Sequence, residues 1–257
     1  MTRGLRGGLI RAFALLPRGL RQRLIQALLA AEETTTPAAA LPWLLGIHDY
    51  VLGVIDGHCI RWGRGVHLKH EVMDGIHSYF CERIPPGARV LDVGCGNGAL
   101  AHAIAEGTDA QVLGVDMDPA HIAFAQARFQ HPRLRFERRD VTADLPDARA
   151  DVVVLSSVLE HLPNRVPLLT HLRTQFGATR FLIRVPMFEY FYVAAIKKAV
   201  GVFAFRDPTH LLEYSPEVLA REVQAAGLTI RTLDIRWGDL WADCVPAPSA
   251  DVGARGE

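Results

Sequence analysis

The sequence has few cysteines and no overall excess of charge, and both shortages exclude classes of protein. Only four of the 257 residues are cysteine, and their positions match neither a disulfide framework nor a zinc knuckle. We therefore expect a reducing, intracellular setting. Lysine and arginine (28) balance aspartate and glutamate (28), so the formal net charge is +0 and nothing in it indicates nucleic-acid binding.

The sequence also lacks a repeat of fixed period and an uninterrupted apolar run long enough to span a bilayer. Its length is sufficient for one large α/β domain with a sizeable core, plus appendages. These absences predict a cytoplasmic protein. Any contact with the inner face of the membrane would then be made by the surface of the protein.

Acidic residues are absent from residues 1–31, which hold six arginines and so carry a charge of +6. Apolar residues recur among them at helical spacing, and Pro17 with Gly19 divides the segment into two predicted helices. Three interpretations remain open: a basic amphipathic surface on an anionic membrane, a helix pair packed on the domain, and an organelle transit peptide, which the lack of serine disfavours. Residues 32–42 have the composition of a linker, so residues 1–66 are predicted as a helical extension and linker.

The clearest motif is RVLDVGCGNGAL, residues 89–100. A short apolar run typical of a buried parallel strand breaks into three alternating glycines and resumes as a helical pattern. The glycines allow a sharp turn and close approach to a ligand, and the free N–H groups of the following helix point to the same place. This pattern predicts a cofactor loop made of Gly94, Cys95, Gly96, Asn97 and Gly98.

The acidic residue Asp92 indicates which cofactor the loop takes. Gly94, Gly96 and Ala99 also satisfy the loose dinucleotide fingerprint, but a buried carboxylate would repel a pyrophosphate. It would attract the ammonium and sulfonium groups of S-adenosylmethionine (SAM). The stretch VLDVGCGNG resembles the first motif of the class I SAM-dependent methyltransferases. The resemblance implies that Asp92 helps to hold the amino acid end of SAM while the glycine loop accepts its carboxylate.

Further cofactor residues are predicted after the next two strands. Residues 111–115 form a second apolar strand ending at Asp116, near the spacing of a ribose-binding carboxylate, and Met117 would then lie beside the adenine. The resemblance implies an acid near the adenine amino group after the third strand, which makes Asp140, with Val141 beside it, the candidates. Asp116 and Asp140 could instead be loop acids without a ligand.

The acceptor side is predicted after the strand at residues 151–155 (DVVVL), which is fully apolar beyond its first residue. Residues just past the carboxyl end of a central parallel strand face the ligand crevice, so Ser156 and His161 lie where the methyl group would be. The segment LEHL occurs in many members of the resembled family with unrelated substrates; His161 is either a general base or a loop-stabilising hydrogen bonder. The late segment HLLEYSPEVLAREVQAAGLTI also resembles the family, which makes His210 and Tyr214 candidates on the substrate side.

Two further stretches allow more than one interpretation. Residues 67–84 are predicted as a helix whose histidines could suggest a metal, but no carboxylate or cysteine cluster supports one, so no metal is predicted. Lys69 or His70 there could instead cap the cofactor pocket. Residues 187–213 are predicted as an apolar lid, because residues 187–205 hold six of the sixteen Phe and Tyr. The lid could serve a lipid-linked acceptor or the membrane face, or could simply pack on residues 1–60.

The predicted fold is α/β, a Rossmann-like doubly wound sheet of seven strands, mostly parallel with one antiparallel strand, and an N-terminal helical extension. The methyltransferase domain is expected at residues 67–245, followed by a disordered tail at 246–257. The predicted activity is SAM-dependent methyl transfer to an oxygen, less readily a nitrogen or carbon, of a small-molecule or lipid-linked acceptor. The alternatives are a nicotinamide (NAD)-dependent oxidoreductase and an inactive binding module that keeps the fold.

Overall fold

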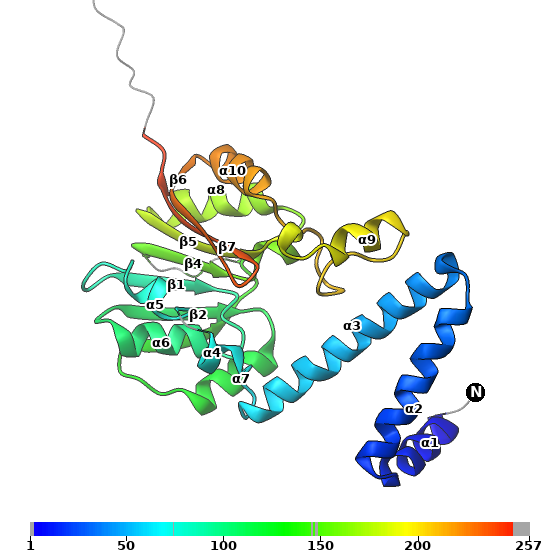
Figure 1. Cartoon of the computed structure of the whole chain (residues 1–257). Coiled ribbons are helices and arrows are strands. Elements are labelled where there is room, and N and C mark those ends of the chain that lie inside the picture. The colour runs from blue at the N-terminus through cyan, green and yellow to red at the C-terminus, as the bar shows by residue number, and fades with distance from the viewer. Residues whose placement is uncertain (1–2, 74, 145, 147–148, 249–257) are drawn as a thin grey trace, which may run out of the picture.

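Seven strands pair into one sheet in the order β3-β2-β1-β4-β5-β7-β6 (Figure 1). This computed structural model describes residues 3–73, 75–144, 146 and 149–248. The first five strands are parallel, and β7 runs antiparallel to both β5 and β6, as predicted. The strands are β1 (Arg89–Val93), β2 (Gln111–Asp116), β3 (Leu134–Arg138), β4 (Val152–Ser156), β5 (Arg180–Pro186), β6 (Leu228–Arg236) and β7 (Asp239–Pro246).

Helices cover both faces of the sheet, which makes the fold doubly wound and Rossmann-like. Alternate residues of β4 enter two separate cores: Val153 and Leu155 belong to one, and Val152 and Val154 to the other. The first core includes side chains of α8 (Arg165–Phe176) and α10 (Pro216–Ala225). The second includes those of α5 (Ser78–Cys81), α6 (Ala99–Gly107) and α7 (Pro119–Arg128).

Local signals in the sequence set where the helices around the site begin. Asp118 accepts a hydrogen bond from the backbone N–H of Ala120 at the start of α7, and Ser215 accepts one from Val218 at the start of α10. Each cap typically contributes about 1 kcal/mol of stability. These caps fix the loops that follow β2 and precede α10, and both loops lie at the carboxyl edge of the sheet.

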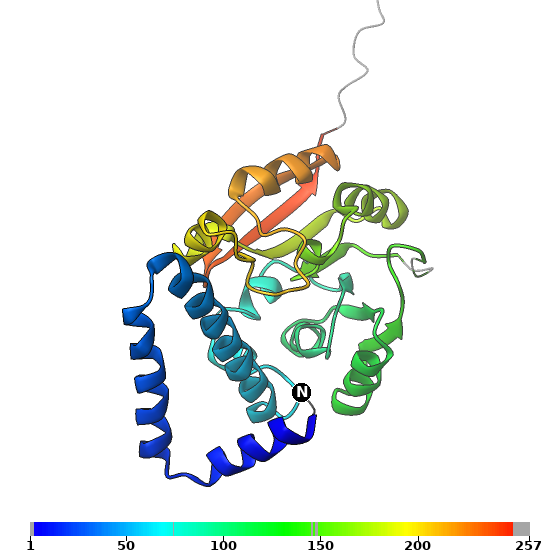
Figure 2. The ribbon, with the colours of Figure 1, turned by 90° about the vertical axis from the view of Figure 1, so that its right-hand side faces the viewer.

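Three helices at the N-terminus stand apart from the sheet: α1 (Arg3–Leu15), α2 (Arg18–Ala31) and α3 (Pro37–Trp62), with the short η1 (Glu32–Thr34) between the last two (Figures 1 and 2). We call residues 3–62 the N-terminal arm. No residue of α2 is buried, and only Ala40 and Leu45 of α3 are. The arm therefore shares little of its surface with the two cores.

The α3 helix corrects two expectations. The predicted linker at residues 32–42 is wrong in its second half, because Pro37 takes the first position of a helix, where its fixed φ is favourable. The second expectation, that no apolar run is long enough to span a bilayer, holds only for an uninterrupted run. The 26 residues of α3 are long and apolar enough to cross a membrane by length and composition, and only 11% of its most apolar window is buried. Asp49 and Asp56 interrupt the run in sequence without ending the helix.

Residues 67–84 form two short helices in place of the single predicted one. These are α4 (Lys69–Val72) and α5, and Gly75 between them has a φ of 82°, in the left-handed region that ends a helix. The predicted tail also begins too early. Pro246 ends β7, and the N–H of Ala247 donates to the carbonyl of Gly227. The remainder of that prediction, residues 249–257, lies outside the described residues.

The predicted lid contains η3 (Phe188–Tyr190) and α9 (Val193–Ala199), followed by an irregular stretch that leads to His210. The α9 helix lies against the arm, where Lys197 Nζ donates to Asp49 Oδ1 at 2.5 Å. Lid residues also pack on each other, because the rings of Phe188 and Phe203 both meet Phe205 edge-on. Its role as a lid stays a prediction.

Candidate active site

The glycine loop after β1 adopts a conformation that other residues would resist. Gly94, Gly96 and Gly98 have φ values of 66°, 52° and 82°. A Cβ on Gly94 would lie 2.7 Å from Val158, and one on Gly98 would lie 2.7 Å from Phe136. The loop is thus pressed between the β4 loop and β3, while Gly96 itself faces open space. A ligand can therefore approach the backbone at Gly96.

Asp92 is a buried carboxyl group with an unsatisfied oxygen. It is 2% exposed, and its Oδ2 has no hydrogen-bond partner among the described residues. Burial first, and then the charge of Asp116, raise its pKa to about 7. A cationic group of a ligand would supply the missing partner and stabilise the ionised form. The residue therefore fits the role predicted for it at the amino acid end of SAM.

Two cavities meet at the glycine loop. The first, of about 590 Å³, is lined by Asp116, Met117, Asp140, Val141 and His161, among others. The second, of about 260 Å³, is lined by residues that include Asp92, Cys95, Asn97 and Ser156. Gly94 and Gly96 border both cavities. The predicted cofactor residues thus surround one continuous region, apart from Gly98, which lines neither cavity and caps α6.

Asp116 organises the loop as well as facing the first cavity. Its Oδ2 accepts from the N–H of Gly96 at 2.9 Å, and its Oδ1 accepts from the N–H of Asp118 at 2.9 Å. The neighbouring Asp140 is exposed and accepts from the N–H and hydroxyl of Thr142, and these bonds lower its pKa. Met117 is 65% exposed at the cavity wall. Each of these roles toward a cofactor stays a prediction.

The second cavity is closed partly by the end of the arm. The side-chain amide of Asn97 donates to the carbonyl of Gly65 at 2.7 Å, just beyond α3. Lys69 and His70 also line this cavity, as the capping interpretation predicts. Burial first, and then the charge of Lys69, lower the pKa of His70 to about 3, and burial lowers that of Lys69. His70 Nδ1 lies 3.1 Å from His77 Nε2, so these two rings form a hydrogen-bonded pair.

Sequence reasoning missed two residues that line these cavities. His121 borders both, with its Nδ1 3.4 Å from Asp116 Oδ1. Its position three residues after the cap Asp118, in the first turn of a helix that follows a ligand-binding strand, was a usable signal. Arg184 is buried in β5, where Asp239 Oδ2 accepts from its Nε at 2.9 Å. An arginine directly after the apolar run FLI in the middle of a strand was the corresponding signal for Arg184.

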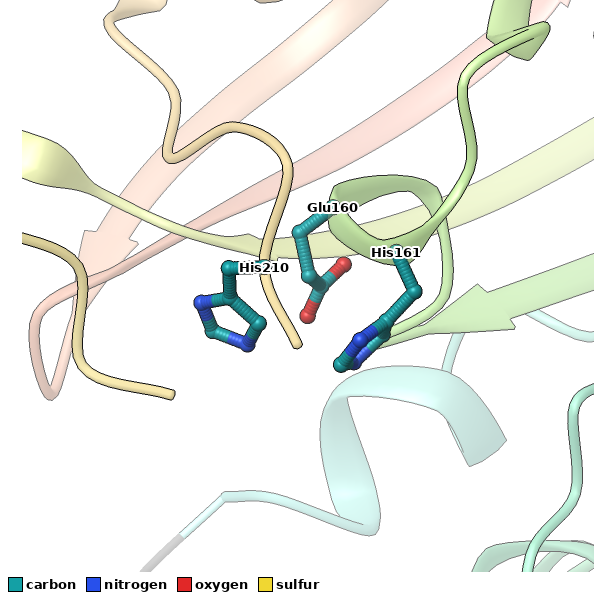
Figure 3. A group of neighbouring side chains, drawn as sticks. All are labelled: Glu160, His161 and His210. Atoms are coloured by element: carbon teal, nitrogen blue, oxygen red, sulfur yellow. The ribbon is translucent and has the colours of Figure 1, made fainter. Parts of the chain in front are cut away.

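Glu160, His161 and His210 come together on the acceptor side, from loops about fifty residues apart. The Glu160 carboxylate lies between the two imidazole rings (Figure 3), whose centroids are 4.8 Å apart. Glu160 is 1% exposed with Oε2 unpartnered among the described residues, and burial raises its pKa to about 7. One ligand atom from each residue lies within 4.8 Å of the others, so the cluster could also hold a metal ion, which the sequence did not predict.

Hydrogen bonds fix the tautomer of His161. The Thr209 hydroxyl donates to Asp207 Oδ1 at 2.5 Å, so it can only accept from His161 Nδ1, 3.0 Å away. Burial, followed by the proximity of His210, lowers the pKa of His161. His210 Nδ1 lies 2.9 Å from Glu213 Oε1, a carboxylate oxygen that accepts its N–H. In neutral His161 the proton therefore lies on Nδ1, which leaves Nε2 as the proton acceptor.

Tyr214 does not face the substrate side, contrary to the prediction. It is fully buried, lines neither cavity, and donates its hydroxyl to Glu222 Oε2 at 2.9 Å. The aromatic ring packs into the first core, so it anchors the loop before α10. Burial raises the pKa of its hydroxyl, which removes it as a base.

A family model described as a methyltransferase domain matches residues 84–222, more than half of the chain. The chain belongs to this family. The methyltransferase is of the SAM-dependent class I type, and SAM is its cofactor, in agreement with the buried, unpartnered Asp92. Membership of this family excludes the alternative of a nicotinamide-dependent oxidoreductase.

Two curated relatives are ubiquinone biosynthesis O-methyltransferases. That of Stutzerimonas stutzeri (strain A1501) is 34% identical over 110 residues, and that of Pseudomonas fluorescens (strain SBW25) is 35% identical over 111 residues. Each match covers 40% of the methyltransferase and 47% of the relative. The chain thus spans about half the length of the curated relatives it matches.

Solved structures show the same fold. One is the magnesium protoporphyrin IX methyltransferase of Synechocystis PCC 6803, with bound S-adenosylhomocysteine (SAH). It is 20% identical, and the match has a TM-score of 0.56 and covers 69% of this chain and 83% of that one. A methyltransferase of calicheamicin biosynthesis, also SAH-bound, is 21% identical, with a TM-score of 0.55 over 78% of this chain and 61% of that one. The predicted Rossmann-like methyltransferase fold is confirmed.

Proposed function

We propose that this methyltransferase transfers a methyl group to a hydroxyl oxygen of a small, apolar acceptor, with His161 as the general base. The observation that carries the proposal is the position of His161, which lines the cofactor cavity beside His210 while its Nδ1 is held by the Thr209 hydroxyl. A neutral imidazole at the carboxyl end of a central strand is suited to remove a hydroxyl proton.

The residues that would hold SAM fit its charges. Asp92 would pair with its ammonium group, Asp116 would accept from the ribose hydroxyls, and Met117 with Asp140 would border the adenine. Bound SAM supplies a methyl group already activated on a sulfonium. The protein's task is to align the acceptor for in-line attack and to receive its proton at His161 Nε2, while Thr209 holds Nδ1–H.

An apolar acceptor class, which includes lipid-linked acceptors, is proposed from the residues around the histidines. Residues 187–213 bring Phe188, Phe203 and Phe205 together next to the segment that carries His210. The curated relatives are named for O-methylation in ubiquinone biosynthesis, which supports oxygen as the acceptor atom. No nucleic acid is proposed as a partner, and the four free cysteines support a cytoplasmic location.

The test is acceptor discovery with isotopically labelled SAM. We would incubate the enzyme with soluble and membrane extracts and search by mass spectrometry for products that gain a labelled methyl group. The proposal expects an O-methylated apolar product and release of S-adenosylhomocysteine. Labelled nitrogen or carbon products would refute oxygen as the acceptor atom. SAM binding without S-adenosylhomocysteine release from any extract would favour the inactive binding module.

A further inference from the structure

The N-terminal arm exposes apolar side chains that the rest of the chain does not cover. Leu9, Leu15, Leu28, Tyr50 and Trp62 are each at least 59% exposed. They are spread over all three helices of the arm, which project from the sheet (Figures 1 and 2). A helix that is apolar around much of its circumference and yet not packed on a core requires another apolar environment.

The charge of the arm indicates which environment this is. Residues 1–31 carry six arginines and no acid, and Arg11, Arg18 and Arg23 are exposed among the apolar side chains. A second copy of this chain would bring the same positive charge to a shared interface. We propose that the N-terminal arm docks on the surface of an anionic lipid bilayer, with its arginines at the headgroups and its apolar side chains in the interface.

The arm lies on the bilayer and does not cross it, although α3 is long enough to do so. Asp49 stands at the middle of α3, 12 residues after Pro37 and 13 before Trp62. A crossing helix would place this carboxylate near the centre of the bilayer, which is costly. Its partner Lys197 is 5% exposed and belongs to α9, so the ion pair also requires the middle of α3 to stay beside the predicted lid.

The arm is joined to the active site at two points. Asp49 pairs with Lys197 in the segment that leads to His210, and beyond the end of α3 the carbonyl of Gly65 accepts from Asn97 of the glycine loop. Docking the arm would therefore place both the acceptor side and the cofactor loop at a fixed distance from the lipid. An apolar acceptor dissolved in the bilayer could then reach the site directly.

The first experiment is co-sedimentation of the full chain with vesicles of phosphatidylcholine alone or with added phosphatidylglycerol. We expect binding to the anionic vesicles only, weakened by salt. The triple variant Arg11→Gln, Arg18→Gln, Arg23→Gln should lower the partition coefficient about fivefold per arginine, or about a hundredfold. The matched control changes three exposed arginines of the sheet region, Arg128→Gln, Arg221→Gln and Arg231→Gln, and should bind like the unchanged protein. Equal losses in both triple variants would overturn the proposal.

Three further outcomes decide how the arm meets the lipid. Trp62 fluorescence should shift to the blue on anionic vesicles, and Trp62→Phe should reduce that shift while Trp237→Phe retains it. Alkaline carbonate should release the protein; retention until detergent is added would show that α3 crosses the bilayer and refute surface docking. A stable dimer in sedimentation velocity without lipid, combined with no vesicle binding, would assign the apolar face to a second copy and also overturn the proposal.

Discussion

The sheet region (residues 67–248) and the N-terminal arm have similar apolar content but bury very different shares of it. In the sheet region, Val152 to Leu155 are all fully buried because helices cover both faces. In the arm, α2 buries no residue and α3 buries two. The first region gains its stability from its own core. The second exposes apolar surface that a folded domain would normally cover, which indicates that its partner lies outside this chain.

The two regions also differ in how they place charge. In the sheet region the buried Arg184 is paired with Asp239, whereas single oxygens of Asp92, Glu160 and Glu213 lack partners among the described residues. In the arm, positive charge gathers without acids near it in sequence. We infer that the unpartnered oxygens near the cavities serve ligand binding and that the arginines of the arm serve attraction to a surface. The predictions below test this contrast, beginning with the largest expected effect.

Replacing His161 should abolish most of the chemistry and leave cofactor binding intact. His161→Gln removes the Nε2 proton acceptor, and loss of a general base typically costs about 10²- to 10⁴-fold in kcat. The fall of kcat at low pH, which reports protonation of the general base, should also be absent in this variant. His171→Gln, on the exposed face of α8, is the matched control and should leave kcat unchanged. A variant with raised KM and unaltered kcat would show that His161 only stabilises its loop.

Replacing Asp92 should weaken SAM binding without unfolding the protein. Asp92→Asn keeps the size of the side chain but removes the charge that would meet the ammonium group. We expect a loss of about 2–3 kcal/mol, or about a hundredfold in Kd, measured by calorimetric titration. Glu106→Gln, an exposed acid at the end of α6, controls for a general change of charge. An unaltered Kd for Asp92→Asn would place the cofactor elsewhere.

The affinity for SAM should rise with pH across the neutral range. Burial raises the pKa of Asp92 to about 7, and only its ionised form attracts a cation. Below that pKa the carboxyl is protonated, so Kd should fall about tenfold per unit as the pH rises from 5.5, and level off above 7. Titrations at several pH values would measure the slope. The same slope in Asp92→Asn would assign it to another group.

Much of the sheet region could be predicted because its signals are local. The glycine spacing after β1, the caps at Asp118 and Ser215, and the apolar run of β4 each determine structure within a few residues. The Glu160–His161–His210 cluster joins loops about fifty residues apart, so the sequence identified two of its members and not their contact. Tyr214 was misjudged because only the packed core shows that its ring turns inward, away from the cavities.

The arm was harder to predict because its helices are not set by a core. The composition of residues 32–42 favours a linker, yet Pro37 begins a helix at the position that suits its fixed φ. The helix continues through Pro42, although that proline removes one i→i−4 hydrogen bond. Asp49 interrupts the apolar run of α3, and its partner Lys197 lies 148 residues away in sequence. Sequence spacing cannot reveal such a pair, so the position of α3 beside α9 could not be predicted.

Removing residues 1–31 should change thermal stability least of all. None of residues 7–31 is buried, so we expect a shift in Tm of less than about 2 °C and an unchanged Kd for SAM. Phe181→Ala, fully buried in β5, is the comparison and should lower Tm by about 10 °C, since such cavities cost about 3–5 kcal/mol. Thermal scans of both variants measure the contrast. A truncation that loses as much as Phe181→Ala would mean that the arm is part of the fold, and its exposed arginines and leucines would then need no lipid to explain them.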